Sequence, residues 1–219
     1  MDKKRKFTLL CITAVMLISL GAVGIYYWYA NTYFVTTEDA KIAGDFVKIA
    51  PQVSGKLVEL NIQEGDRVAK DQIIGRIEAL GLDTAGIDTS LLRAPLAGLI
   101  VKKQANVGEY VASNSAPTLA LMVDPDKLYV NANIEETKIE QVKPGQAVDI
   151  SVDQLKNTTL KGWVESIGAA SNSAFSLLPA SSSGTFTKVV QTVPVKIVLE
   201  NAGVTLTPGT NAVVKIHIK

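Results

Sequence analysis

The residue types that most often perform chemistry in proteins are scarce in this chain. Its 219 residues include one histidine, His217, and one cysteine, Cys11. A zinc centre needs three or four such ligands, and a nucleophilic cysteine needs a base that accepts its proton. His217 lies in the alternating pattern KIHIK, which explains it as a strand residue, and Cys11 lies in a long apolar run. The sequence also has no G-x-S-x-G motif and no phosphate-binding glycine loop. These residue types predict no catalytic, metal or cofactor site.

A long apolar segment near the N-terminus predicts a membrane anchor. Residues 7–30 read FTLLCITAVMLISLGAVGIYYWYA, and no charged residue occurs between Lys6 and Glu38. As a helix, this segment would span roughly 36 Å, enough for a hydrocarbon core of ~30 Å. The basic tail at residues 1–6 predicts a cytoplasmic N-terminus, so the rest of the chain would be periplasmic or extracellular. The alternative is a cleaved signal peptide. Its apolar region would be shorter, and the residues that follow that region would be small rather than aromatic.

The charge of the exported part excludes a typical nucleic-acid-binding protein. The chain has 22 basic and 21 acidic residues; residues 1–37 contain four of the basic and one of the acidic residues, which leaves 18 against 20 and a net charge of −2. No basic patch follows the anchor. We therefore expect no nucleic-acid partner.

Two segments after the anchor share one pattern. They are VSGKLVELNIQEGDRV, which begins at residue 53, and LAGLIVKKQANVGEYV, which begins at residue 96. In both, a second glycine follows the first by 10 residues, and an acidic residue comes next. The expected turn glycines are Gly55, Gly65, Gly98 and Gly108. Short apolar runs between glycines are typical of short strands, so one β unit is expected to occur twice and to pack into a sandwich or flattened barrel. The alternative is two unrelated glycine turns.

The first of these segments leads into a pattern that resembles lipoyl and biotinyl domains. Residues 64–79 (EGDRVAKDQIIGRIEA) match the run that precedes the modified lysine, and Gly81 stands where the biotinyl signature has that lysine. Residues 78–93 contain no lysine, which excludes lipoate or biotin attachment there. Lys70 is most simply a solvated turn residue.

Four further segments resemble the membrane fusion proteins, which are adaptors of secretion and efflux pumps. They are residues 36–57 (TTEDAKIAGDFVKIAPQVSGKL), 91–100 (LLRAPLAGLI), 173–180 (SAFSLLPA) and 187–197 (TKVVQTVPVKI). The resemblance is to the EmrA-type branch of the HlyD-like adaptors and covers nearly the whole chain. It implies a mainly β fold, a homo-oligomer, and a partner transporter of the major facilitator type in the cytoplasmic membrane.

The resemblance also divides the chain into domains. We expect a linker and first strand at residues 31–46, a lipoyl-like domain at 47–124 and a small antiparallel β-barrel domain at 125–219. The halves of the lipoyl-like domain are residues 47–78 and 92–124, joined by a short junction at 79–91. Family members usually insert a long α-helical hairpin at this junction. Thirteen residues with two glycines cannot build one, which argues against contact with an outer-membrane exit duct through a hairpin tip.

The last domain reads as strands separated by turns. The strand patterns occupy residues 128–134, 146–152, 160–168, 192–200 and 211–219. Pro-Gly pairs at Gly145 and Gly209 predict type II turns. Asn133, with Glu136 three residues later, predicts the start of a short helix.

An irregular excursion, residues 171–187, interrupts these strands. It is rich in serine but carries Phe175, Leu177 and Leu178. Either these side chains pack on the barrel, or they contact a transporter or a neighbouring subunit.

The sequence thus predicts a non-catalytic, membrane-anchored adaptor of an export pump that uses neither a metal nor a cofactor. The rival interpretation is a tethered extracytoplasmic module that binds a ligand or a wall polymer.

Overall fold

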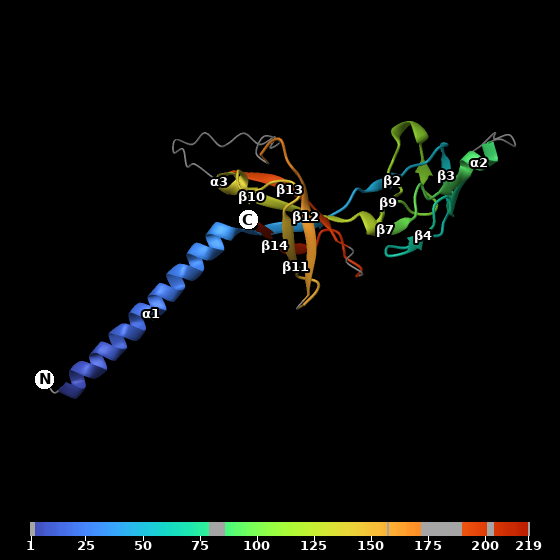
Figure 1. Ribbon diagram of the computed structural model, residues 1–219. Helices are drawn as coiled ribbons and strands as arrows, with labels where there is room; N and C mark the ends of the chain where they lie inside the picture. Colours follow the sequence, from blue (N-terminus) through green and yellow to red (C-terminus); the bar gives the residue numbers. More distant parts are fainter. Residues whose placement is uncertain (1–2, 79–85, 157, 172–189, 201–203, 219) are drawn as a thin grey trace, which may run out of the picture. The chain divides into compact units, whose positions relative to one another are not determined.

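The protein is a mainly β molecule with one long N-terminal helix, which confirms the predicted fold class. The computed structural model describes residues 3–78, 86–156, 158–171, 190–200 and 204–218. These residues form two compact units: one contains residues 1–41, 130–202 and 210–219, and the other contains residues 42–129 and 203–209 (Figure 1).

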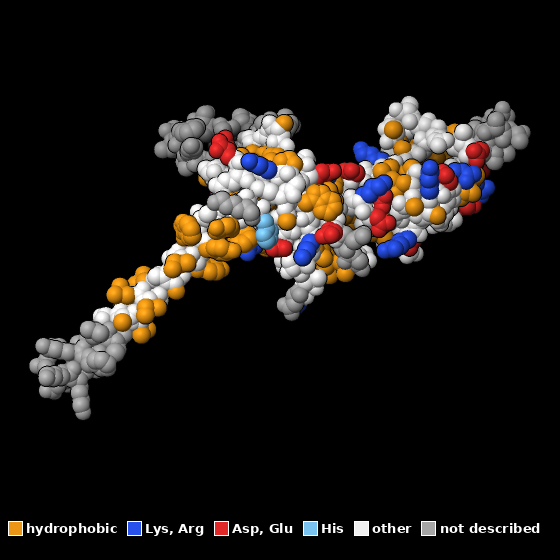
Figure 2. Space-filling view, in the orientation of Figure 1, with side chains coloured by type: hydrophobic (Ala, Val, Ile, Leu, Met, Phe, Trp, Pro, Cys, Tyr) orange, Lys and Arg blue, Asp and Glu red, His pale blue; other side chains and the backbone are white. Residues whose placement is uncertain are grey.

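The first element is the predicted apolar helix. Helix α1 covers Lys3–Tyr33, so it extends beyond the expected segment, residues 7–30, at both ends. Within it, residues Ile12–Tyr33 are long and apolar enough to cross a membrane, by length and composition alone. None of its apolar window is buried in the protein, and Figure 2 shows exposed hydrophobic side chains along the helix.

The unit that contains α1 also contains a closed six-stranded barrel. Its strands are hydrogen-bonded in the order β1-β10-β13-β12-β11-β14. Their bounds are β1 Phe34–Ala43, β10 Tyr129–Glu135, β11 Ala147–Val152, β12 Thr159–Ile167, β13 Thr192–Leu199 and β14 Asn211–His217. Alternate residues of these strands fill the barrel with aliphatic side chains such as Val130, Ile150 and Ile197. β1 directly follows α1 and pairs with β14, so the chain enters the barrel before it forms the second unit.

The predicted turns of the barrel are confirmed, but the predicted helix start is wrong. Gly145 and Gly209 have φ values of 88° and 91°, which suits the third position of a type II turn. The short helix α3 covers Glu136–Ile139, and its first turn has no side-chain cap. Asn133 instead lies in β10, where its side-chain amide donates a hydrogen bond of 2.9 Å to the carboxylate of Asp39. The Asn133 side chain, which the local sequence predicts as a helix cap, therefore bonds to a residue on a neighbouring strand instead.

The other unit contains two four-stranded sheets, ordered β2-β9-β7-β4 and β6-β5-β3-β8. Strand bounds are β2 Val47–Ile49, β3 Gly55–Leu60, β4 Arg67–Val68, β5 Ile73–Glu78, β6 Leu91–Arg93, β7 Gly98–Lys103, β8 Tyr110–Val111 and β9 Ala120–Val123. Short helices cover Gly86–Ser90 (α2), Ser113–Ser115 and Pro125–Lys127. We call this unit the lipoyl-like domain. Its apolar core includes Leu57, Ile77, Ile100 and Met122.

Candidate functional site

The two half-motifs form a symmetric pair inside the lipoyl-like domain. Each contributes one strand to each sheet, because β3 pairs with β8 and β4 pairs with β7. The Gly65 N–H donates a hydrogen bond of 2.8 Å to the carbonyl of Ile100, and the Gly108 N–H donates one of 2.7 Å to the carbonyl of Leu57. The N–H groups of Leu57 and Ile100 donate in return, at 2.8 and 2.9 Å, to the residue after the opposite glycine. The repeat seen in the sequence is therefore an approximate two-fold symmetry of the fold.

The four glycines of the repeat have two different structural roles. Gly65 and Gly108 have φ values of 95° and 98°, a conformation that L side chains rarely adopt. Gly55 and Gly98 do not lie in turns but begin strands β3 and β7. A Cβ atom at these two positions would overlap the backbone carbonyl of Glu78 or Val123 on the neighbouring strand. Equivalent glycines thus meet equivalent constraints.

The end of the domain where β5 leads through α2 into β6 is the place where carrier domains present a lysine; we call this end the tip. Arg93 holds the described part of the junction, because its guanidinium pairs with Asp88 at 2.9 Å and donates to the carbonyl of Asp71 at 3.2 Å. Gly81 lies outside the described residues. Lys70 is an exposed residue of the turn between β4 and β5.

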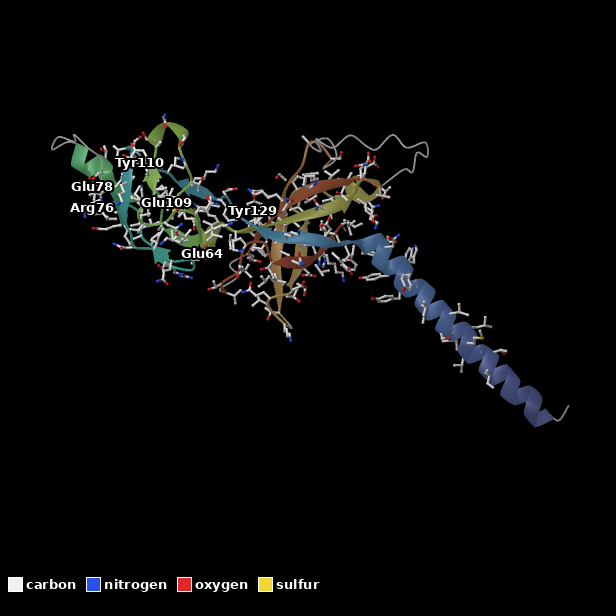
Figure 3. All side chains as sticks on the ribbon, turned by 180° about the vertical axis from the view of Figure 1, so that it is seen from behind. Glu64, Arg76, Glu78, Glu109, Tyr110 and Tyr129 are labelled. Atoms are coloured by element: carbon white, nitrogen blue, oxygen red, sulfur yellow. The ribbon has the colours of Figure 1, made fainter. Side chains whose placement is uncertain are left out.

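A small pocket of about 350 Å³ opens at the tip, and none of the predictions from the sequence includes it. Its lining residues are Ser54, Gly55, Lys56, Glu78 and Tyr110. Lys56 is the cross-strand neighbour of both Glu78 and Tyr110. These three residues therefore form one row on the outer face of the sheet. Tyr110 is 75% exposed. Figure 3 shows Tyr110 and Glu78 close together at the α2 end of the domain.

A second pocket lies at the position that the two-fold symmetry relates to the tip pocket. Its volume is about 300 Å³, and Arg67 and Gly98 line it together with Asp124, Pro125 and Asp126. Arg67 occupies the place in the repeat that Tyr110 occupies in the other half. That difference between aligned half-motifs is the sequence signal that could have identified the tip pocket.

The histidine takes part in a structural contact in the barrel unit. His217 Nε2 lies 2.7 Å from Asp149 Oδ2, and its ring packs edge to face on Phe34 at 5.0 Å between centroids. The Lys215 ammonium lies 3.8 Å from the centre of the Phe34 ring. These contacts join β1, β14 and β11 beside the end of α1. Among the described residues, no group of three or more His, Cys, Asp or Glu side chains could hold a metal ion.

The barrel also carries a partly exposed apolar row. Trp163 on β12 is 43% exposed, and its cross-strand neighbours are Ala147 on β11 and Val198 on β13. The salt bridge between Lys196 and Glu165, 2.8 Å long, connects β13 and β12. The expected contact residues Phe175, Leu177 and Leu178 lie outside the described residues.

Two family models match consecutive parts of the chain. Residues 45–124 match "RND MFP, barrel-sandwich hybrid domain", and residues 127–217 match "AAEA-like beta-barrel domain". A relative from Bacillus subtilis (strain 168), described as "Putative efflux system component YhbJ", is 40% identical over 187 residues, which are 85% of this chain and 80% of the relative.

Several solved structures share the fold of this chain. The periplasmic adaptor protein EmrA has a TM-score of 0.59 at 13% identity, with 84% of this chain and 98% of that chain covered. The membrane fusion protein Spr0693 from Streptococcus pneumoniae R6 has a TM-score of 0.59 at 12% identity, with 85% and 99% covered. A MacA-MexA chimera that contains the Pseudomonas aeruginosa MexA alpha-hairpin domain reaches 0.66 at 18% identity, with 85% and 82% covered. These structures show a shared fold. The relative from Bacillus subtilis and the two matching domain models show that the chain belongs to the membrane fusion proteins, the adaptors of efflux systems.

Proposed function

We propose that this protein is a non-catalytic adaptor subunit of a multidrug export pump, anchored in the cytoplasmic membrane by one helix. The observation that carries the proposal is the order of its parts: an apolar helix, a barrel and a lipoyl-like domain whose junction lacks the carrier lysine. Such rigid β domains suit an assembly role, because their buried side chains form cores rather than reaction sites. The relative YhbJ is described as an efflux component, which supports the same role.

The proposed topology places the N-terminus in the cytoplasm. Residues 1–6 would form the cytoplasmic tail and residues 7–30 the anchor, followed by a linker and first strand at 31–46. The lipoyl-like domain, residues 47–124, and the barrel domain, residues 125–219, would lie outside the membrane. Four basic residues before the anchor support this orientation, because cytoplasmic flanks favour Lys and Arg.

The proposed partner is a transporter of the major facilitator type. Support comes from the EmrA-type sequence motifs, and the fold of EmrA is also similar. The family model that matches residues 45–124 is named for RND adaptors. The first experiment should therefore identify the class of the transporter. Contact with an outer-membrane duct is not part of the proposal, because the 13-residue junction leaves no room for a hairpin.

We further propose that several copies surround the transporter. Exposed Trp163, with exposed Ala147 and half-buried Val198 beside it, supports a protein contact on the barrel, because aromatic residues are enriched at interfaces. Phe175, Leu177 and Leu178 are the proposed contact residues of the excursion at 171–187.

A pull-down of the full chain in mild detergent, analysed by mass spectrometry, tests the proposal. A multi-span major facilitator protein should be enriched with the wild-type chain. A Trp163→Ser variant should lower either the recovered transporter or the number of adaptor copies, while an exposed Lys161→Ser variant on the same strand serves as the matched control. Enrichment of an RND protein would show that the partner is an RND transporter rather than one of the major facilitator type. Recovery of no transporter would refute the adaptor role.

A further inference from the structure

We propose that the tip pocket is a binding site for a saccharide, such as a glycan strand of a cell wall. The inference does not depend on the transporter or its class. It rests on the chemistry of the pocket and on its difference from the symmetry-related pocket.

The first step is that the fold does not require the aromatic side chain of Tyr110 in the tip pocket. Where the fold imposes a constraint, the two half-motifs agree: Gly55 and Gly98 both face a neighbouring carbonyl, and Gly65 and Gly108 both have positive φ. Around the two pockets the halves differ. Tyr110 in one half corresponds to Arg67 in the other, although the two residues occupy equivalent short strands.

The second step is that an exposed aromatic ring lies beside a cavity of ligand size. The volume of about 350 Å³ lies at the lower end of the range for small-molecule pockets. The Tyr110 side chain is 75% exposed, so its ring face is available to a ligand. Gly55 has no side chain to fill the cavity. Ser54 is held in place, because its hydroxyl oxygen accepts the Ser113 N–H at 2.9 Å.

The third step is the identity of the polar groups. Lys56 supplies hydrogen-bond donors and Glu78 supplies acceptors, and within the described residues neither side chain makes an ion pair. One positive and one negative group give no net charge that would select an anion. A single carboxylate supplies too few ligands for a metal ion. One aromatic ring offers too little apolar surface for a hydrophobic ligand.

A sugar ring matches this combination. It presents an apolar face of C–H groups that can stack on an aromatic ring, and its hydroxyl groups both donate and accept hydrogen bonds. Stacking on Tyr110 would leave those hydroxyls directed at Lys56 and Glu78 on the adjacent strands. A peptide or a protein surface is the competing occupant, and the experiment below distinguishes it.

The test uses the full chain in a detergent without a sugar headgroup. Binding is measured by sedimentation with insoluble peptidoglycan and by ligand-observed NMR with soluble peptidoglycan fragments and an N-acetylglucosamine hexamer. Wild-type protein should bind at least one of these probes. Tyr110→Ala should weaken binding by about tenfold or more, and Tyr110→Phe, which keeps the ring, should stay within about threefold of wild type.

The symmetry-related residue provides the matched control. Arg67→Ala removes an exposed side chain from the equivalent strand and should leave saccharide binding unchanged. Glu78→Gln and Lys56→Gln should each weaken binding, whereas the unfolding midpoint of every variant should stay near that of wild type because all these side chains are exposed.

Three outcomes would overturn the proposal: no binding by the wild-type chain, binding by Tyr110→Ala equal to wild type, or an equal loss in Arg67→Ala. If Tyr110→Ala loses a copurifying protein and the wild type binds no saccharide, the tip is a protein contact instead. Transporter recovery is measured on the same wild-type sample. Saccharide binding without a transporter would refute the adaptor proposal alone, and the reverse result would refute the tip proposal alone.

Discussion

Replacing the positive-φ glycines of the lipoyl-like domain tests the symmetry of its fold most directly. Gly65 and Gly108 have φ values of 95° and 98°, and a Cβ atom at either position would meet no heavy atom within 4 Å. The cost of Gly65→Val or Gly108→Val is therefore backbone strain without a steric clash. Such strain costs about 1–3 kcal/mol at each position. Because the two sites are equivalent, the two variants should lose similar amounts of stability.

The size of the thermal shift follows from the size of the domain. A loss of 1 kcal/mol lowers the midpoint of a domain of roughly 60–100 residues by about 4–8 °C. Each valine variant should therefore lower the midpoint of the lipoyl-like domain by roughly 4–24 °C. Gly55→Ala should cost more than Gly65→Ala, because its Cβ would overlap the carbonyl of Glu78 and the two strands would have to separate.

The assay is thermal unfolding of the full chain in detergent, combined with hydrogen exchange followed by mass spectrometry. Faster exchange should be confined to peptides of the lipoyl-like domain. Gly145→Val is the matched control, because Gly145 has φ +88° and open space around it but lies in the barrel unit. It should accelerate exchange in β11 and β12 instead. If Gly65→Val and Gly108→Val both melt and exchange like the parent protein, the proposed turn geometry is wrong.

Three further predictions concern the anchor, the junction and the excursion. If α1 is an uncleaved anchor, the mature protein should keep Met1, apart from ordinary initiator removal, and stay in the membrane pellet after a carbonate wash; a mature N-terminus near residue 31 would contradict this. The intact mass should show neither lipoate nor biotin, and Lys70→Arg should leave export unchanged; a cofactor-sized mass increment on any lysine would indicate a carrier. Changing Phe175, Leu177 and Leu178 together to Ser should abolish transporter recovery with little change in the unfolding midpoint. A parallel loss of stability would instead assign them to the barrel core, where burial of each is worth about 1.5–3 kcal/mol.

The repeat could be predicted from sequence because its constraints are local. Equal spacing between Gly55 and Gly65 and between Gly98 and Gly108 reflects one strand-turn-strand unit used twice. The strand patterns of the barrel were also readable, because alternation between buried and exposed positions is a property of each strand alone. Observed strands β10 to β13 lie within one residue of the expected ranges, and β14 ends two residues before the end of its expected range.

The features that sequence reasoning missed depend on partners far away in the chain. β1 belongs to the barrel because it pairs with β14, about 180 residues later. Asn133 resembles a helix cap next to Glu136, yet its partner is Asp39 on another strand. The tip pocket likewise requires β3, β5 and β8 to be neighbours before Lys56, Glu78 and Tyr110 can form one row.

A repeated fold contains its own control for separating structural residues from functional ones. Residues that the fold needs should be the same in both halves, as Gly65 and Gly108 are, since the same backbone geometry occurs twice. Residues that serve a ligand or a partner need to occur only where that ligand binds. Tyr110 and Arg67 occupy equivalent strands with different chemistry, so the backbone geometry that the two halves share does not dictate either side chain. In a chain whose junction is too short for a helical hairpin, a ligand held at the tip is a physical alternative to an extended arm.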